Sequence, residues 1–334
     1  MLCKRSQQSQ MTQSPPISIY QLAQQLGVST TTISRVLNGR EGIGQATRQR
    51  VWEAARASGF RPRMAVRQRT VGVVQDFVPE HFMGMQLSSL NIGVDRALTE
   101  KNFSIETFGT HNIDSITDRY LDAVLAIAWE TKTIQTLKQL SQTIPVVIFN
   151  RPEIMEFSSV NMDCKQGGKL AAQHFWSKGH RRIGMMATKP TDETLAYTSG
   201  MKQYIESQGG SFHEDHVAYN FFRSSLAPLK RLLAQDITAI FLPNSELTYE
   251  VPYLSMEGLN LSVPEDLSLI GMDANPALQF YRPPMTVLSE PLNDMAMKGI
   301  NLLQESIDEP DRRPTQTTLD YQLIIRESVA NPHS

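Results

Sequence analysis

The sequence is poor in cysteine, with only Cys3 and Cys164 in 334 residues. A structural disulfide is therefore not expected, and a reducing cytoplasm fits this composition. No apolar run is long enough to cross a membrane or to act as a signal peptide, so no membrane partner is predicted. The sequence also lacks a phosphate loop, a dinucleotide fingerprint and a Gly-x-Ser-x-Gly elbow. We therefore expect a protein that is not an enzyme and needs no cofactor.

Charge is plentiful but unevenly distributed. Up to Thr70 the chain carries eleven Lys or Arg and two acids, a net charge of +9, whereas the remainder carries −11. A basic head on an acidic body is typical of a phosphate-binding module attached to a body that stays off DNA. Residues 1–17 are rich in Ser and Gln, and we predict that they form a disordered leader.

Residues 19–38 predict two short helices that cross at a tight turn. Apolar side chains fall on one face of each helix: Leu22, Ala23 and Leu26 on the first, and Ile33, Val36 and Leu37 on the second. Gly27 allows the turn and Ser29 caps the second helix, while Ser18 and Gln21 fit a capping box before the first. A third helix, from about Gln45 to Ala57, completes a helix-turn-helix module over residues 18–60.

The opposite face of the second helix is polar. Thr31, Ser34, Arg35 and Asn38 follow the i, i+3, i+4, i+7 rule, with Thr30 beside them. All can hydrogen-bond, as a face that lies in a DNA major groove requires. A helical hairpin whose polar face merely meets water is the alternative, and the basic charge of the head favours DNA.

The segment 61–70, RPRMAVRQRT, is a basic linker whose arginines are expected to touch phosphates or enter a minor groove. After it, short apolar runs alternate with amphipathic stretches. The apolar runs are Val71–Val74, Ala123–Ala128, Pro145–Phe149, Ile183–Met186, Ala239–Leu242 and Leu267–Met272, and the amphipathic stretches include Leu90–Thr99, Thr133–Gln142, Gly167–Ser177 and Ser225–Ala234. This alternation predicts two doubly wound α/β lobes over residues 71–330, with a ligand crevice at the carboxyl ends of the strands.

Several motifs in this order resemble the lactose/galactose repressor (LacI/GalR) family over residues 17–328. The head reads I-Y-x-L-A-x-x-x-G-V-S-x-x-T-I-S-R-V-L-N-G from Ile19, and the body supplies G-H-R-R-I-G from Gly179, V-P-E-D-L-S-L-I-G-M-D from Val263 and L-I-I-R-E-S from Leu323. The resemblance implies an all-α head on a body of periplasmic-binding-protein type. It also implies a homodimer that reads a near-palindromic operator in double-stranded DNA. The first lobe would use Val71 to Ser158 plus a segment after Pro291, and the second Ser159 to Glu290 plus the last strand.

The same resemblance assigns roles in DNA binding. Thr30, Thr31 and Arg35 would contact base edges, and Ser18, Ser29, Ser34, Asn38 and Thr47 would hold the DNA backbone. The linker departs from the family pattern, because it is short and Arg69 stands where a wedging leucine is usual. Either Met64 or Val66 serves as the wedge, or Arg69 reads a narrow groove electrostatically, or no ordered hinge forms. Arg61 is expected to touch phosphate.

For the small-molecule effector, the resemblance implies a sugar held by paired polar groups and covered by an aromatic ring. Asp163, Asn244 and Asp273 stand where such polar groups stand. Tyr197 replaces the usual arginine, Ser245 and Ala274 replace residues that are usually acidic, and Glu290 lies where glutamine is common. Phe82, Trp129 and Phe222 are the candidate aromatics, although Trp129 fits the lobe core equally well. The pocket is expected to bind a small polar ligand that need not be a usual sugar.

Two other interpretations are less favoured. His213 and His216, with Glu214 and Asp215, lie in a polar loop, so a solvated surface is preferred to a metal site. A sugar-binding protein that serves a transporter would share the body, but would have no use for a basic three-helix head. The sequence predicts a ligand-gated transcriptional repressor of carbohydrate-utilisation genes. A corepressor-dependent regulator that responds to a non-sugar metabolite stays open.

Overall fold

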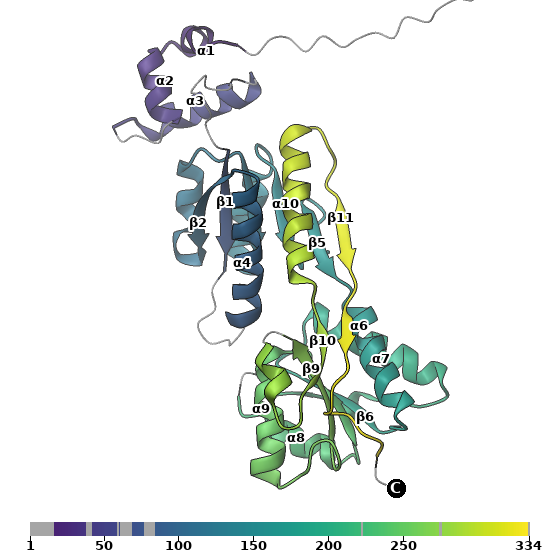
Figure 1. Ribbon diagram of the computed structural model, residues 1–334. Helices are drawn as coiled ribbons and strands as arrows, with labels where there is room; N and C mark the ends of the chain where they lie inside the picture. The colour runs from purple at the N-terminus through teal and green to yellow at the C-terminus, as the bar shows by residue number, and fades with distance from the viewer. Residues whose placement is uncertain are drawn as a thin grey trace, which may run out of the picture.

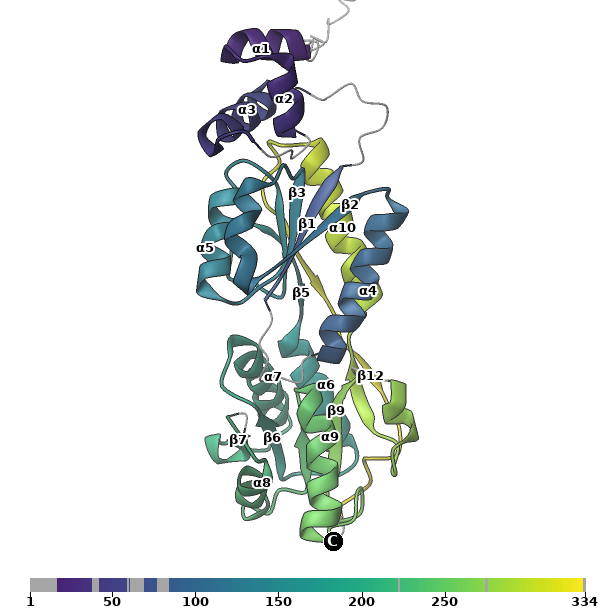
Figure 2. The same cartoon turned by 90° about the vertical axis from the view of Figure 1, so that its left-hand side faces the viewer.

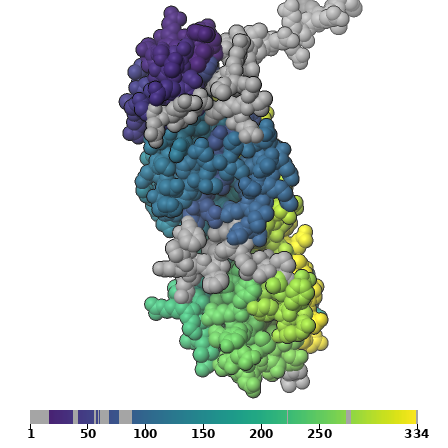
Figure 3. All heavy atoms as spheres, turned by 60° about the vertical axis from the view of Figure 1, so that its left-hand side comes forward, coloured from purple at the N-terminus to yellow at the C-terminus, as the bar shows by residue number. Residues whose placement is uncertain are grey.

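The computed structural model describes residues 17–37, 42–58, 60, 69–76, 84–221, 223–273 and 276–332. A helical head, a first lobe and a second lobe follow one another along the long axis of the molecule (Figures 1 and 2). The space-filling view in Figure 3 shows the same three parts stacked end to end. No helix within the described residues is long and apolar enough to cross a membrane.

The head consists of α1 (Ile19–Leu26), α2 (Thr30–Leu37) and α3 (Gln45–Ala57). The predicted capping box is present, because the Ser18 hydroxyl accepts from the Gln21 N–H while the Gln21 side chain accepts from the Ser18 N–H. Gly27 ends α1 with φ +66°, the left-handed conformation that the turn requires. The Ser29 hydroxyl accepts from the Thr32 N–H at 3.0 Å and so caps α2. The three helices close around Leu22, Ala23, Ile33, Val36, Leu37, Val51, Trp52, Ala55 and Phe60.

The head also touches the body. Tyr120, in the loop before the third strand of the first lobe, packs against the apolar core of the head. Gln45, the first residue of α3, donates from Nε2 to the carboxylate of Asp118 at 3.3 Å. The head therefore contacts the first lobe by a surface that does not involve the linker.

The first lobe is a fully parallel six-stranded sheet in the order β11-β5-β4-β3-β1-β2. Its strands are β1 (Thr70–Gln75), β2 (Ser104–Gly109), β3 (Ala123–Ile127), β4 (Val146–Phe149), β5 (Ser158–Met162) and β11 (Gln316–Leu319). Helices α4 (Gly84–Glu100) and α10 (Leu292–Asp308) cover one face, and α5 (Thr131–Leu140) with the short helix η1 (Thr110–Asp118) covers the other (Figure 2).

The second lobe has the sheet order β12-β10-β9-β8-β6-β7, parallel except for β12. Its strands are β6 (Ile183–Ala187), β7 (Val217–Tyr219), β8 (Ala239–Phe241), β9 (Ser268–Asp273), β10 (Thr286–Ser289) and β12 (Gln322–Ile324). Its helices are α6 (Cys164–Ser177), α7 (Asp192–Ser207), α8 (Leu226–Leu233) and α9 (Ser245–Tyr253), with the short turns η2 (Glu214–His216), η3 (Leu254–Gly258) and η4 (Pro276–Phe280). Helices α6 and α7 touch through glycine, since a Cβ at Gly200 would lie 1.9 Å from the Lys165 carbonyl oxygen.

The chain crosses between the lobes three times, and the first crossing differs from the prediction. We expected it before Ser159, but β5 pairs with β4 and β11 in the first sheet and the chain crosses only after Met162. The reason is that every side chain of β5 is buried by the first lobe, although its sequence, SSVNM, is too polar to read as a buried strand. The other crossings follow β10 at Glu290 and β11 at Asp320, so α10 and β11 join the first lobe as expected.

These crossings fix which ends of the sheets face each other. The chain leaves β5 and β10 from their carboxyl ends to reach the opposite lobe, and the neighbouring strands run parallel to them. The carboxyl ends of both sheets therefore lie at the junction between the lobes, which is where open α/β sheets bind ligands.

Candidate functional site

The head presents the polar face that the sequence predicted. Ile33, Val36 and Leu37 are buried against α1 and α3, whereas Thr31 and Arg35 point the other way and are exposed. Thr30 and Ser34 are half-buried beside them. Asn38 lies outside the described residues. The arrangement suits insertion of α2 into a major groove, since its apolar face is used by the core and its hydrogen-bonding face is on the surface.

The candidate contacts to the DNA backbone surround this face. Ser18 and Ser29 are exposed at the amino ends of α1 and α2, where their hydroxyls serve as caps. Thr47 is half-buried in the first turn of α3. Helix amino ends are favourable places for phosphate, because backbone N–H groups there have no partner within the helix. The linker candidates Arg61, Met64 and Val66 lie outside the described residues.

Arg69 is the described end of the linker. Its guanidinium lies 2.8 Å from the carboxylate of Asp308, the last residue of α10, and its side chain is 29% exposed. The structure therefore places Arg69 against the first lobe, at the side nearest the head.

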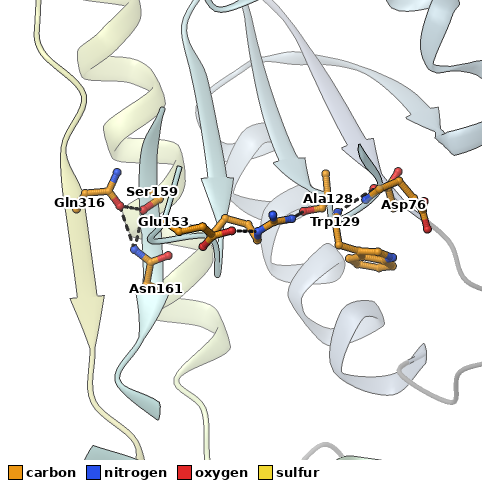
Figure 4. A network of polar contacts seen from close by, with 9 residues as sticks. Asp76, Ala128, Trp129, Glu153, Ser159, Asn161 and Gln316 are labelled. Carbon is orange, nitrogen blue, oxygen red and sulfur yellow. Dashed lines mark hydrogen bonds and ion pairs between the residues drawn. The ribbon is translucent and has the colours of Figure 1, made fainter. Parts of the chain in front are cut away.

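At the lobe junction, the sequence analysis missed Asp76, which follows β1 and is fully buried. Its carboxylate accepts from the N–H groups of Trp129 (2.9 Å) and Glu130 (2.7 Å), and from the hydroxyls of Thr110 (2.9 Å) and Thr133 (2.6 Å). Four donors compensate the burial of one charge. They also fix the loop after β3, from which the Trp129 ring projects beyond the strand ends (Figure 4). An acid placed directly after a buried strand was the available signal.

Arg151 is a second residue that the sequence analysis missed. It follows β4, donates from Nη1 to the Ala128 carbonyl at 2.9 Å and pairs through Nε with Glu153. Glu193 stands in the first turn of α7 in the other lobe. Burial, and next the neighbouring Glu290, raise the pKa of Glu193 to about 7, whereas Arg151 opposes this rise. The Glu193 side chain is exposed to solvent, and charges from both lobes act on its carboxyl group, namely Glu290, Arg151 and Glu153.

The predicted effector residues occupy this junction to different degrees. Asp163 caps α6 by accepting from the Gln166 N–H at 2.9 Å, and Asn244 accepts from the Thr188 N–H at 3.0 Å. Glu290 accepts from the Tyr321 hydroxyl at 3.1 Å. Asp273 ends β9, next to Ser289 of β10, but its side chain lies outside the described part, as do Phe82 and Phe222.

Tyr197 is buried beneath the junction. Its side chain is 4% exposed and its hydroxyl donates to that of Tyr321 at 2.5 Å. Burial raises the pKa of both tyrosines well above 10, so both stay neutral donors. Burial likewise raises the pKa of the neighbouring Cys164 thiol to about 12. Tyr197 therefore acts on the junction through Tyr321 and Glu290, beneath the surface that a ligand would touch.

A groove of about 480 Å³ lies on the first lobe. It runs between α4, β1, β2 and η1, and its lining includes Asn91, Val94, Ile105, Phe108 and His111. Its lining also includes Gln75 and Gly109, the last residues of β1 and β2, so the groove reaches the carboxyl ends of these two strands at the edge of the sheet.

Known proteins match both parts of this architecture. A family model for bacterial regulatory proteins of the lacI family matches residues 18–63, and one for a periplasmic binding protein-like domain matches residues 172–329. The transcriptional repressor CytR of Escherichia coli is 28% identical over 324 residues, which cover 90% of this chain and 93% of CytR.

Two solved structures extend the comparison. A complex of the transcriptional regulator CelR with cellobiose has a TM-score of 0.69 at 25% identity, covering 93% of this chain and 99% of that one. The lac repressor dimer bound to operator and an anti-inducer has a TM-score of 0.67 at 15% identity, covering 95% and 100% of the two chains, and shows the fold alone.

A helix-turn-helix head with an exposed polar helix face, joined to two α/β lobes with polar groups at their junction, defines a DNA-binding transcriptional regulator. With matches to both domains and along nearly the whole chain, the protein belongs to the LacI family of bacterial regulators.

Proposed function

We propose that this regulator is a homodimeric repressor of carbohydrate-utilisation genes, gated by a small polar ligand, with a sugar as the first candidate. The observation that carries the proposal is the convergence of Asp163, Asn244 and Glu290 on the lobe junction, each at the carboxyl end of a different strand. Oxygen acceptors from several strands suit a ligand rich in hydroxyl donors. The relatives support this, since CelR was solved with cellobiose and CytR is a repressor.

Around these acceptors, the junction offers the other contacts that a sugar needs. Arg151 supplies a donor from the first lobe, and the Trp129 ring, held by Asp76, supplies an apolar face. Glu153, Glu193 and Glu290 outnumber Arg151, so the site favours a donor-rich ligand over an anionic one. This acidic excess is also the feature that favours the alternative, a regulator of the same design that responds to a non-sugar metabolite with a cationic group.

Gating follows from the three crossings. A ligand that touches both lobes stabilises one lobe arrangement over the other, and the energy available is its difference in affinity for the two. Movement at the crossings shifts the first lobes, and through them the two heads of a dimer, relative to their half-sites. Whether the bound ligand releases or promotes DNA binding depends on which arrangement fits the operator.

A homodimer is proposed because two heads are needed to read a near-palindromic operator. Apolar side chains are exposed along the α4–α10 surface of the first lobe, with Ile92 at 69% and Met297 at 38% exposure. The lac repressor, solved as a dimer on its operator, supports the arrangement.

The experiment is selection of bound duplexes from a random pool by the full-length, ligand-free protein at near-physiological salt. Enrichment of a near-palindrome is expected, and the recovered duplex is then used to screen sugars, cellobiose among them, for release. Asp273→Ala is expected to keep DNA binding and abolish the response. Binding that is only salt-sensitive and sequence-independent would contradict a ligand-released repressor, and enrichment restored by an added metabolite would identify the corepressor form.

A further inference from the structure

The ion pair between Arg69 and Asp308 joins the linker to the end of α10. Arg69 is the last residue before β1, and its Nη2 lies 2.8 Å from Oδ1 of Asp308. The two side chains are 29% and 50% exposed, so the pair can open without unfolding the lobe.

Both partners are held in place by further bonds. The second oxygen of Asp308 accepts from Nε2 of Gln304, one turn earlier on α10, at 2.6 Å. The Arg69 carbonyl accepts from the Ser104 N–H at 2.8 Å, which anchors its backbone to β2. The Asp308 carboxylate and the Arg69 backbone are therefore held in place, whereas the Arg69 side chain can rotate toward another partner.

The position of Asp308 in its helix is unusual. A negative charge in the last helical turn meets the partial negative charge of the unpaired carbonyls there, so an acid is disfavoured on helix grounds alone. The ion pair with the Arg69 guanidinium compensates this unfavourable placement of Asp308. Since α10 begins at Leu292, two residues after Glu290 at the lobe junction, the helix also spans the first lobe from the ligand side to the head side (Figure 1).

We propose that Asp308 is a positioning residue for DNA binding, which holds the Arg69 guanidinium against the first lobe and competes for it with DNA phosphate. The inference rests on the proposed role of Arg69 as a DNA contact. A phosphate group offers the same bidentate acceptor geometry as the carboxylate, so the two are alternative partners for one arginine.

The test uses the full-length protein and a mixed-sequence duplex of fixed length, with affinity measured over a range of salt. Asp308→Asn is expected to bind about two- to fivefold more tightly than the wild type, the worth of a partly exposed ion pair. The gain should shrink as salt rises, because both the pair and the phosphate contact are screened. Unchanged melting temperatures establish that the variants are folded.

Glu305→Gln is the matched control. It removes the same charge from the last turns of α10, but its partner is Arg312, 2.6 Å away, and not Arg69. Equal gains from Asp308→Asn and Glu305→Gln would mean a general loss of repulsion and would overturn the proposal. In an Arg69→Gln background, Asp308→Asn should raise DNA affinity no more than Glu305→Gln does. The full gain in affinity in that background would also overturn the proposal.

The outcomes also separate this inference from the proposed function. If the wild type binds and selects an operator but Asp308→Asn behaves like the control, only the restraint is refuted. If the wild type binds no duplex with or without candidate ligands, both fail together.

Discussion

Tyr321 donates its hydroxyl proton to Glu290 over 3.1 Å and receives that of Tyr197 over 2.5 Å. Tyr321 lies at the third crossing and Glu290 at the second. Gln166, just after the first crossing, binds both the N–H of Tyr321 (3.0 Å) and its carbonyl (3.2 Å). The Asp163 N–H donates to the Leu319 carbonyl at 2.8 Å. All three segments that join the lobes are thus tied to one tyrosine, which couples their movements.

Tyr321→Phe is expected to destabilise the protein by about 1–3 kcal/mol, because the buried hydroxyl of Tyr197 loses its acceptor. Tyr197→Phe should cost less, since the Tyr321 hydroxyl keeps Glu290 as its acceptor. Chemical denaturation of the two variants side by side measures the difference. A larger loss in Tyr197→Phe would contradict the donor order inferred here.

Glu193 gives a pH dependence of known sign. Its pKa rises from 4.5 to about 7 on folding, so between these values the folded protein binds more protons than the unfolded chain. The stabilisation linked to the protonated carboxyl is therefore fully present below pH 4.5 and lost as the pH rises through 7. Glu193→Gln should raise the melting temperature above pH 7 and leave it nearly unchanged at acid pH. Glu257→Gln, an exposed acid in η3, serves as control, and equal pH profiles for both variants would refute the assignment.

The buried histidines of the second lobe predict a dependence of opposite sign. Burial is the main cause that lowers the pKa of His174 and His180 below 6.5. The unfolded chain then binds more protons, so stability is intact above pH 6.5 and falls as the pH drops below it. His174→Gln should flatten this loss in thermal melts, whereas the exposed His111→Gln should not. If the wild type and His174→Gln lost the same stability at acid pH, the loss would come from groups other than His174.

Much of the fold was predictable because strands buried on both faces read as continuous apolar runs. All six predicted runs are strands, and the fold class is confirmed. The strands outside these runs are β2, β5, β7, β10, β11 and β12. All six lie at or beside sheet edges, where one side meets solvent or a turn and polar residues enter the pattern, as in Q-T-T-L of β11. The first lobe crossing was misplaced for a related reason, since β5 buries Ser159 and Asn161, which bond to Gln316 of a strand far along the chain.

The candidate sites divide in the same way. The polar face of α2 was predictable because helical periodicity is local, although the roles of its residues stay predictions. Asp76, Arg151 and Tyr321 were missed because their partners come from other strands and crossings. Asp76 meets Trp129, for example, only because β1 pairs with β3. The local pattern marks Asp76 as an acid directly after a buried strand, but it does not identify Trp129 as its partner.

Arg35 tests the reading face most directly. Its side chain is exposed on α2, opposite the buried Ile33 and Val36, so Arg35→Ala should leave the fold of the head intact. We expect a loss of about 1–3 kcal/mol that is confined to operators with the matching base pair, because an arginine in a major groove reads a base edge. Arg61→Ala should instead weaken all sequences alike and lower the salt dependence. Competition among operators with single base changes measures both effects. If Arg35→Ala weakened every operator equally, Arg35 would be a phosphate contact, and the base-reading residues would have to be sought at Thr30 and Thr31.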